Sequence, residues 1–494
     1  MIYPLIIITP IVSESDLSDF LSGTSLVFLG NIIGTILGFS LRIGPARLLG
    51  PEEYGYFVLG LTIVNFVGLI SHLGIPEGLG KMVPTTDKVS KYVSTGTIIG
   101  IIFASLVSIV LLLLSREISV FVSDVAFEPT LIPFLLGIPL FVSFKTSIGV
   151  LRGKEDSVGR VLIEVVYRST TVCAVVLGIL FTKDSIGAGI GWTVAMLVTA
   201  VTGVGIFKKR HSIDLAVSKI APRQGQKLLL FSLPLVLATS SRKLMQELDT
   251  VAVSFFLDDS KFVGYYDSAY TISRSLFVIL WTFSFLFMPY LSKKFQSDRS
   301  SIKSDYIVVT RWISTLSLPI ALLIIFNPSW TIEFIFGQEY AVATYPLRIL
   351  AVCFISHSLF GPNRSALVAG EQNRYAFLAT LIPLGFNIFL NIILVPRIGM
   401  AGAAAATTVS YILMNILYSA RLYNLYNIYP TNLRSILFYS QSIITYYLIH
   451  QFFTDYSLHN IISISIIHTT THILSYIMIA SDQKDKDVFN ELIQ

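Results

Sequence analysis

The chain has 494 residues, of which 53% are hydrophobic and only 13% are charged, and its mean hydropathy is +0.72. Soluble domains carry about 25% charged residues, so this composition excludes an ordinary soluble protein and indicates one that crosses a membrane many times. At about 20 residues per helical span, the length accommodates more than a dozen transmembrane helices. The two cysteines, Cys173 and Cys353, lie in apolar runs without ligand spacing, so we expect no disulfide framework.

The first 21 residues predict an uncleaved leader at the cytoplasmic membrane interface rather than a signal peptide. The stretch MIYPLIIITPIV lacks a basic start and contains two prolines. The acidic SESDLSD follows it, where a signal peptide would need a small-residue cleavage site.

Hydropathy windows predict an all-α, polytopic membrane protein with about fourteen transmembrane helices. The expected spans are 22–43, 55–73, 93–115, 131–151, 159–181, 186–207, 227–256, 263–291, 306–327, 345–368, 375–395, 399–420, 435–453 and 457–480. Four histidines lower the hydropathy of the last two spans, which therefore give the weakest signal.

Basic residues in the short loops indicate which end of each helix faces the cytoplasm. With the N-terminus inside, the cytoplasmic loops hold 21 Lys and Arg residues and the outer loops hold six. The largest basic group is KKRHSIDLAVSKIAPRQGQK, between the sixth and seventh spans. Because short loops rich in Lys and Arg stay inside, we expect both termini in the cytoplasm and the protein in the cell membrane.

The two halves of the chain resemble each other. Residues 48–63 (LLGPEEYGYFVLGLTI) match residues 256–272 (FLDDSKFVGYYDSAYTI), and Gly187 and Gly399 lie 212 positions apart in similar glycine-rich turns. Six spans per repeat give both halves one orientation, with a symmetry axis along the membrane normal, as in many transporters. The expected units are a leader (1–21), an N-lobe (22–207), a basic cytoplasmic linker (208–226), a C-lobe (227–426), two extra helices (435–480) and a cytoplasmic tail (481–494).

Four motifs in this order carry a family resemblance: ARLLGPEEYGYF, VGYYDSAY, IFGQEYAVAT and PRIGMAGAAAATTVSY. They are similar to the Wzx-type polysaccharide flippases of the multidrug/oligosaccharidyl-lipid/polysaccharide superfamily, over about residues 22–426. The resemblance implies a V-shaped pair of six-helix lobes around a central cavity. It also implies alternating access, in which the head group of a lipid-linked sugar crosses the membrane while its polyprenyl tail stays in lipid.

Positive charge exceeds negative charge inside the predicted spans. The basic residues there are Lys145, Arg168, Arg242, Lys243, Arg274, Arg311, Arg348 and Arg364, and the clear acids are Glu164, Glu247 and Asp249. A charge at the centre of a bilayer costs about 2.5–3.5 kcal/mol on insertion scales, so this surplus requires a counter-ion. The phosphate of a lipid-linked sugar would supply one, and Arg suits phosphate because its planar group donates two hydrogen bonds.

The stretch SSRKLMQELD, at 240–249, places four charges in one apolar run. On a helix, Arg242 shares a face with Asp249, while Lys243 and Glu247 form an i, i+4 pair. We interpret Arg242 and Lys243 as phosphate-binding groups, with Asp249 and Glu247 orienting them or carrying a coupling proton. The alternative is that these pairs only neutralise each other. Arg274 is the strongest phosphate-binding candidate, because no acid lies within four residues of it.

Other charges have weaker functional signals. Glu164 is a third candidate for ion coupling, although its i, i+4 spacing from Arg168 favours a structural pair. Arg364 is a candidate phosphate ligand near a helix end, where basic side chains also extend to the lipid head groups. Arg42 and Arg47 flank the outer end of the first span, and they are predicted either to bind the head group during release or to anchor the helix.

Competing functions fit the sequence less well than lipid-linked sugar transport. Membrane glycosyltransferases or polymerases that use polyprenyl-linked sugars carry an acidic pair in the first outer loop, and Glu52 and Glu53 stand there. Such an enzyme would also need larger outer loops than this chain has. A drug antiporter would need acids rather than bases in its cavity, whereas a lipid II flippase remains an alternative. We therefore predict a transporter and no enzyme, without catalytic residues, metal ligands or cofactor. Its expected partners are the lipid-linked sugar, the bilayer and neighbouring glycan polymerases, glycosyltransferases or oligosaccharyltransferases, with no nucleic acid.

Overall fold

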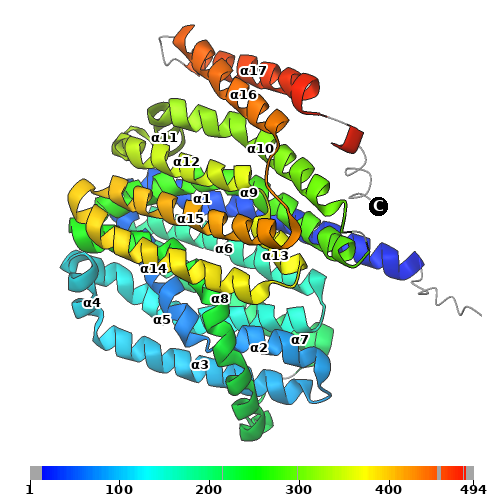
Figure 1. Ribbon diagram of the computed structural model, residues 1–494. Coiled ribbons are helices and arrows are strands. Elements are labelled where there is room, and N and C mark those ends of the chain that lie inside the picture. Colours follow the sequence, from blue (N-terminus) through cyan, green and yellow to red (C-terminus); the bar gives the residue numbers. More distant parts are fainter. Residues whose placement is uncertain (1–13, 214, 298, 453–457, 482, 486–494) are drawn as a thin grey trace, which may run out of the picture.

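The computed structural model describes residues 14–213, 215–297, 299–452, 458–481 and 483–485, and within these the side chains of 14–32, 234–243, 245 and 246 are not described. The described chain is helical throughout and contains no strand, as predicted from composition (Figure 1). Eleven of its helices are long and apolar enough to cross a membrane. The count of fourteen and the internal repeat stay predictions. Of the predicted leader, residues 1–13 lie outside the described residues, and residues 14–21 form the start of a long helix.

Seven helices, kept here under the name N-lobe, form the first half of the bundle. They are α1 (Glu14–Ser71), α2 (Ile75–Met82), α3 (Val89–Leu113), α4 (Ser115–Val122), α5 (Glu128–Gly153), α6 (Ser157–Thr182) and α7 (Ser185–His211). Helix α1 is broken at Gly50, whose φ of 76° lies in the left-handed region that glycine tolerates. This break separates the first two predicted spans.

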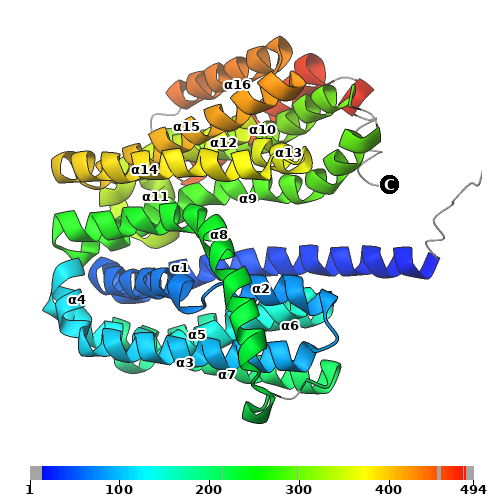
Figure 2. The ribbon, with the colours of Figure 1, turned by 60° about the horizontal axis from the view of Figure 1, so that its bottom comes forward.

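Eight helices, here the C-lobe, form the second half. They are α8 (Pro222–Leu257), α9 (Ser260–Ser297), α10 (Ile302–Phe326), α11 (Pro328–Phe336), α12 (Thr344–Phe360), α13 (Asn363–Ala369), α14 (Asn373–Ile398) and α15 (Met400–Tyr426). Helix α8 crosses α2 and α3 before it packs against α14 (Figure 2). The predicted span 345–368 is two helices, because Gly361 adopts a φ of 68° and Pro362 follows it.

The two lobes meet at the end of the bundle that is predicted to face outward. Helix α1 packs along α9, and Gly55 lies so close to Ser260 that any side chain at position 55 would clash with its carbonyl. Tyr340 donates a hydrogen bond to the carbonyl of Ala46 across the same contact (2.9 Å). These close approaches hold the lobes together at this end.

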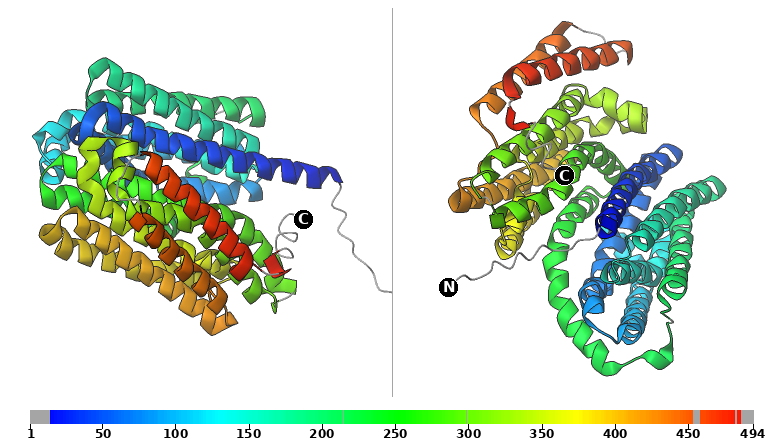
Figure 3. Two further views of the ribbon diagram at one scale, coloured as in Figure 1. Left: turned by 90° about the horizontal axis from the view of Figure 1, so that it is seen from above. Right: turned by 90° about the vertical axis from the view of Figure 1, so that its right-hand side faces the viewer.

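The last two long helices, α16 (Leu433–Phe452) and α17 (Leu458–Ser475), lie against α10 on the side of the C-lobe (Figure 3). Polar contacts attach them, since apolar helices gain little from contact with each other inside lipid. Asn327 donates to the Tyr446 hydroxyl at 2.9 Å, and Arg311 pairs with Asp485 at 2.7 Å. The short segment after α17 therefore anchors the pair to α10.

Two aspartates cap consecutive helices of the N-lobe. Asp156 accepts from the backbone of Gly159 at the start of α6 (2.7 Å), and it also binds Arg210 and His211 at the end of α7. Although burial acts to raise the pKa of Asp156, hydrogen bonds from Arg210, Gly159 and His211 outweigh burial and hold that pKa below its ordinary value. Asp184 makes the same kind of cap on α7, to Gly187 at 3.0 Å.

We expect Asp156→Ala to lower the thermal stability of the detergent-solubilised protein more than Asp184→Ala does. Both substitutions remove a helix cap worth about 1 kcal/mol. The Asp156→Ala substitution also removes the ion pair with the half-exposed Arg210, which is worth up to about 1 kcal/mol more. Asp156→Asn keeps the cap and removes the charge. Because the charged form of Asp156 is the stabilising one, its advantage over asparagine is present at neutral pH and disappears as the pH falls through the lowered pKa. Equal melting temperatures for wild type and Asp156→Ala would contradict this account.

Candidate functional site

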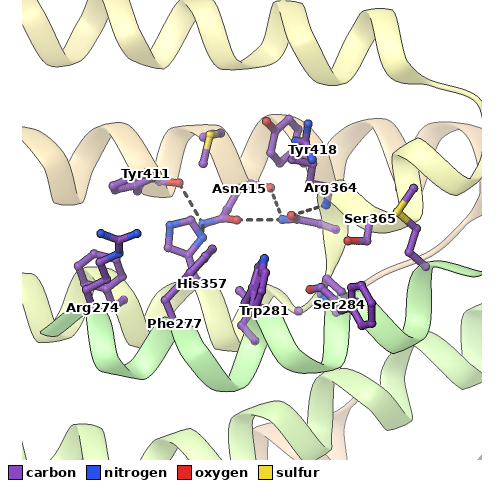
Figure 4. Close-up of a pocket in the computed structure, with 18 residues that line it drawn as sticks. Arg274, Phe277, Trp281, Ser284, His357, Arg364, Ser365, Tyr411, Asn415 and Tyr418 are labelled. Atoms are coloured by element: carbon purple, nitrogen blue, oxygen red, sulfur yellow. Dashed lines mark hydrogen bonds between the residues drawn. The ribbon is translucent and has the colours of Figure 1, made fainter. Parts of the chain in front are cut away.

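A pocket of about 250 Å³ lies inside the C-lobe, between α9, α12, α13 and α15. Arg274 stands toward one end and Arg364 toward the other, with Trp281, His357 and Asn415 between them (Figure 4). Both arginines are exposed, and none of the described residues that line the pocket is acidic. The pocket therefore joins two of the predicted phosphate ligands in a space without opposing carboxylates.

The break at Gly361 places the second arginine in this pocket. Gly361 ends α12, and Asn363 begins α13, where its side-chain oxygen accepts a hydrogen bond from the backbone N–H of Arg364 (2.7 Å). A side chain at position 361 would clash with Thr310 on α10, so glycine is required sterically as well as conformationally. A continuous helix over 345–368 would have pointed Arg364 elsewhere.

A buried carboxylate contacts α9 and α15, two of the helices that form the pocket, and also α14. Asp249 on α8 is fully buried and accepts hydrogen bonds from Tyr266 (2.9 Å), Asn391 (2.9 Å), Asn387 (3.2 Å) and Thr407. All four donors are neutral, and no described basic side chain forms an ion pair with Asp249. Two hydroxyls and two side-chain amides thus stabilise a single negative charge. The two hydroxyl oxygens are groups that a small cation bound to Asp249 can also contact.

The two predicted arginines at the outer end of α1 bind the C-lobe instead of facing an open cavity. Arg42 forms an ion pair with Asp267 on α9 (3.0 Å), and the Tyr54 hydroxyl donates to the same carboxylate at 2.5 Å. Arg47 donates to the carbonyls of Ile335 (2.8 Å) and its neighbour on α11. Both arginines therefore connect the lobes where the lobes meet.

The remaining predicted residues are not gathered at the pocket. Glu164 pairs with Arg160 at 3.1 Å instead of the expected Arg168, because the Arg168 guanidinium turns to α1 and donates to the carbonyl of Gly34 (2.6 Å). The expected Glu164–Arg168 pair is thus wrong. Glu247 is half-buried. The side chains of Arg242 and Lys243 lie outside the described residues, so their phosphate-binding role stays a prediction.

Three other in-span basic residues have structural partners. Lys145 lies over the rings of Phe141 and Phe144, at 5.1 Å from each centroid. Arg348 donates to a backbone carbonyl of α10, and Arg311 holds the C-terminal segment. These contacts account for their charges without a ligand.

Several residues of the site were not predicted from the sequence. Asn387 and Asn391 could have been predicted, because two side-chain amides four residues apart are unusual in an apolar run such as FNIFLNIIL. His357, Asn415 and Asp267 had none that is specific, since each acquires its partner only when distant helices pack together.

Comparison with known proteins agrees with this architecture. Residues 20–295 match the family model described as polysaccharide biosynthesis protein, and residues 169–467 match the model of the lipid II flippase MurJ. The chain is 24% identical over 407 residues to the "probable low-salt glycan biosynthesis flippase Agl15" of Haloferax volcanii, covering 81% of this chain and 83% of that protein.

Solved structures share the fold at low sequence identity. A structure of the lipid II flippase MurJ in an inward closed conformation superimposes with a TM-score of 0.74 at 16% identity, covering 91% of this chain and 98% of that one. An inward-facing multidrug resistance transporter of the MATE family gives a TM-score of 0.65 at 17% identity, covering 78% and 92%. These likenesses establish a multi-pass membrane transporter fold. Because the polysaccharide biosynthesis model spans more than half of the chain, this protein belongs to that family, the one its four sequence motifs resemble.

Proposed function

We propose that this protein is a flippase that moves a polyprenyl-phosphate-linked sugar or oligosaccharide from the cytoplasmic to the outer face of the cell membrane. The observation that carries the proposal is the C-lobe pocket, which contains Arg274 and Arg364 but no acidic residue among its described lining. Positive charge inside a membrane protein is costly unless an anion compensates it. A lipid phosphate is an anion that can reach such a pocket while its hydrocarbon tail remains in the bilayer.

The contact between the lobes supports alternating access around this pocket. Arg42, Asp267 and Tyr54 join α1 to α9 at the predicted outer end, so this conformation is closed there. Opening to the outside requires that Arg42 leave Asp267. A guanidinium released in this way is available to the phosphate, which gives the helix-one arginines a role in release of the head group.

We place both termini in the cytoplasm on the basis of the loop charges. The ends of α7 and α8 nearest the linker carry a basic cluster that includes Lys208, Lys209 and Arg223, all of them exposed. Cytoplasmic loops keep such residues inside. In that orientation the sugar is loaded where nucleotide-activated sugars are used and delivered to polymerases, glycosyltransferases or oligosaccharyltransferases outside.

Transport of lipid II itself is a second candidate, favoured by the match of residues 169–467 to the lipid II flippase model. Both substrates carry a phosphate at the end of a polyprenyl tail, so the arginines of the pocket suit either one. A cation-coupled drug antiporter fits less well, because a cationic drug would meet Arg274 and Arg364 without an acid to bind it.

Asp249 is our candidate for the coupling ion. It accepts from four neutral donors, and the side-chain oxygen of Asn391 is buried without a hydrogen-bond partner among the described residues. This oxygen of Asn391 can accept from, or contact, a cation that binds at Asp249. Glu247 and Glu164 remain weaker candidates, the latter because Arg160 already pairs with it.

We expect Arg274→Gln to abolish transport, because a neutral amide cannot compensate a phosphate charge, whereas Arg274→Lys retains part of it. The test is complementation of the deletion strain, with mass spectrometry of the lipid-linked sugars that accumulate. Arg348→Gln, at comparable membrane abundance, serves as the matched control, because Arg348 does not line the pocket and donates to the backbone carbonyl of Ile325.

The accumulated lipid also identifies the substrate class. A peptide on its head group would indicate lipid II, whereas a sugar without peptide supports the proposed glycan carrier. Unchanged lipid-linked sugars together with loss of drug export would contradict both flippase functions.

We expect Asp249→Asn to remove the dependence of transport on an ion gradient while leaving the protein folded. The asparagine oxygen can accept from Asn387 and Asn391, and its NH₂ group can donate to the hydroxyls of Tyr266 and Thr407. In proteoliposomes with an imposed proton or sodium gradient, flipping by the wild type should be stimulated and flipping by the variant should not. Glu164→Gln is the control that keeps stimulation. If Asp249→Asn responds to the gradient as wild type does, the coupling site is elsewhere.

A further inference from the structure

One face of α9 runs from the contact between the lobes into the C-lobe pocket. Asp267, Arg274, Trp281 and Met288 follow one another along this helix at intervals of seven residues. Residues seven apart share one face of an α-helix, because seven residues make almost two full turns. Asp267 pairs with Arg42 of α1, whereas the other three line the pocket. The surface of α9 that meets the N-lobe is therefore continuous with the pocket wall.

Trp281 lies between the two arginines of the pocket (Figure 4). It is seven residues from Arg274, about 10 Å along the helix axis, and fourteen residues from Asp267, about 21 Å. Both steps lead away from the closed contact and toward the end of α9 that is predicted to face the cytoplasm. A head group that enters from the cytoplasm therefore reaches Trp281 before it meets the closed contact.

The indole of Trp281 presents an aromatic surface that the fold does not use. Trp281 is 41% exposed, and none of the described residues forms a hydrogen bond with its indole or stacks a ring on it. Phe277, one turn earlier, instead packs its ring against those of Phe354 and His357, at centroid distances of 6.4 and 5.4 Å. Tryptophans that anchor a helix at the membrane interface lie near its ends, but Trp281 is close to the midpoint of α9 (Ser260–Ser297). Its exposed surface is therefore available to a ligand.

The charges of the pocket match the parts of a lipid-linked sugar to different walls. The face of an aromatic ring carries partial negative charge, so the phosphate belongs with the arginines rather than on the indole. A cationic ligand would favour the indole face, but the same arginines repel it. The hydrocarbon tail remains in the bilayer. The part that fits the indole is the sugar, whose ring presents C–H groups on its faces and hydroxyls around its edge.

Size and polar groups agree with one sugar ring at this position. The pocket volume is about 250 Å³, below the range of about 300–1,000 Å³ that is typical of sites for drug-sized ligands. This volume suits a single sugar unit better than an oligosaccharide. The hydroxyls of Ser284 and Ser365 belong to the same lining, and each can donate to or accept from a sugar hydroxyl. A ring stacked on the indole keeps its own hydroxyls at its edge, where such contacts form.

We propose that Trp281 is the recognition platform for the sugar nearest the lipid phosphate, which stacks on the indole while Arg274, two helical turns away, binds the phosphate. This inference rests on the proposed flippase function and deepens it, because it locates the first sugar. Stacking contacts C–H groups rather than individual hydroxyls, so it tolerates several hexoses. The pocket therefore selects a glycosylated lipid over a bare one, instead of selecting one particular sugar.

Two substitutions at position 281 and one control separate stacking from general packing. Trp281→Leu removes the aromatic face and keeps an apolar side chain, whereas Trp281→Phe keeps a smaller aromatic face. Because the indole has no hydrogen-bond partner among the described residues, neither change leaves a polar group unpaired. Trp330→Leu is the matched control, since Trp330 on α11 stacks on Phe334 with ring centroids 5.0 Å apart and does not line the pocket.

The experiment measures binding of polyprenyl monophosphate to the purified full-length protein, both bare and carrying glucose, galactose or N-acetylglucosamine. Wild type and Trp330→Leu should prefer sugar-bearing lipids over the bare lipid. In Trp281→Leu this preference should fall by about three- to tenfold, the effect of one aromatic contact, while affinity for the bare lipid is unchanged. Trp281→Phe should keep part of the preference, and Arg274→Gln should weaken binding of every lipid. Tryptophan emission gives a second readout, because a sugar-bearing lipid should change it in wild type more than in Trp281→Phe.

The outcomes distinguish this inference from the function on which it rests. A wild-type preference retained in Trp281→Leu would overturn the inference, and so would a wild-type protein that prefers none of the sugars. An equal loss of bare and sugar-bearing lipid in Trp281→Leu, at the wild-type melting temperature, would place the tail on the indole and would also overturn it. In each case, binding of the bare lipid that depends on Arg274 would leave the flippase function standing. Absence of Arg274-dependent binding to any of these lipids would reject the function itself.

Discussion

The cost of holding a charge inside a membrane protein separates the basic residues of this chain into two groups. Arg42, Arg311 and Arg168 have partners built into the fold: a carboxylate on another helix, the C-terminal segment and a carbonyl on α1. Arg274 and Arg364 line a pocket in which the described walls contain no acid. In our proposal, an anion that enters and leaves this pocket compensates the positive charge there.

The same reasoning applies to the contact between the lobes. Interactions that must break in each transport cycle should be few and local, whereas those within a lobe should be extensive. The described polar contacts between α1 and the C-lobe concentrate near its break at Gly50, where Arg42 meets Asp267 and Ala46 meets Tyr340. Close packing at Gly55 adds shape complementarity there. Helix α8 supplies the continuous connection, since it contacts both lobes.

Sequence alone predicted the class of fold because lipid imposes a simple rule, in which each crossing needs a long apolar helix. It also selected Arg274, since an arginine without nearby acids in an apolar run is unusual. It could not predict the partners of Asp249, because Asn387 is 138 positions away and is brought close only by packing of α8 against α14. The predicted partner of Glu164 was wrong, because a basic residue lies four positions away on either side of it. Arg168 turns toward α1 and binds the carbonyl of Gly34, which leaves Arg160 to pair with Glu164.

Helix α9 links the candidate ion site to the candidate substrate site. Tyr266, which donates to Asp249, and Arg274, which lines the pocket, lie eight residues apart on this helix, about 12 Å along its axis. The same helix carries Asp267, the partner of Arg42 at the contact between the lobes. A change in the charge at Asp249 alters the hydrogen bond of Tyr266, and a rigid helix transmits a small displacement there to both neighbours. The proposed ion site, the contact between the lobes and the proposed phosphate site thus share α9, which would give coupling a physical route without requiring the ion and the sugar to meet.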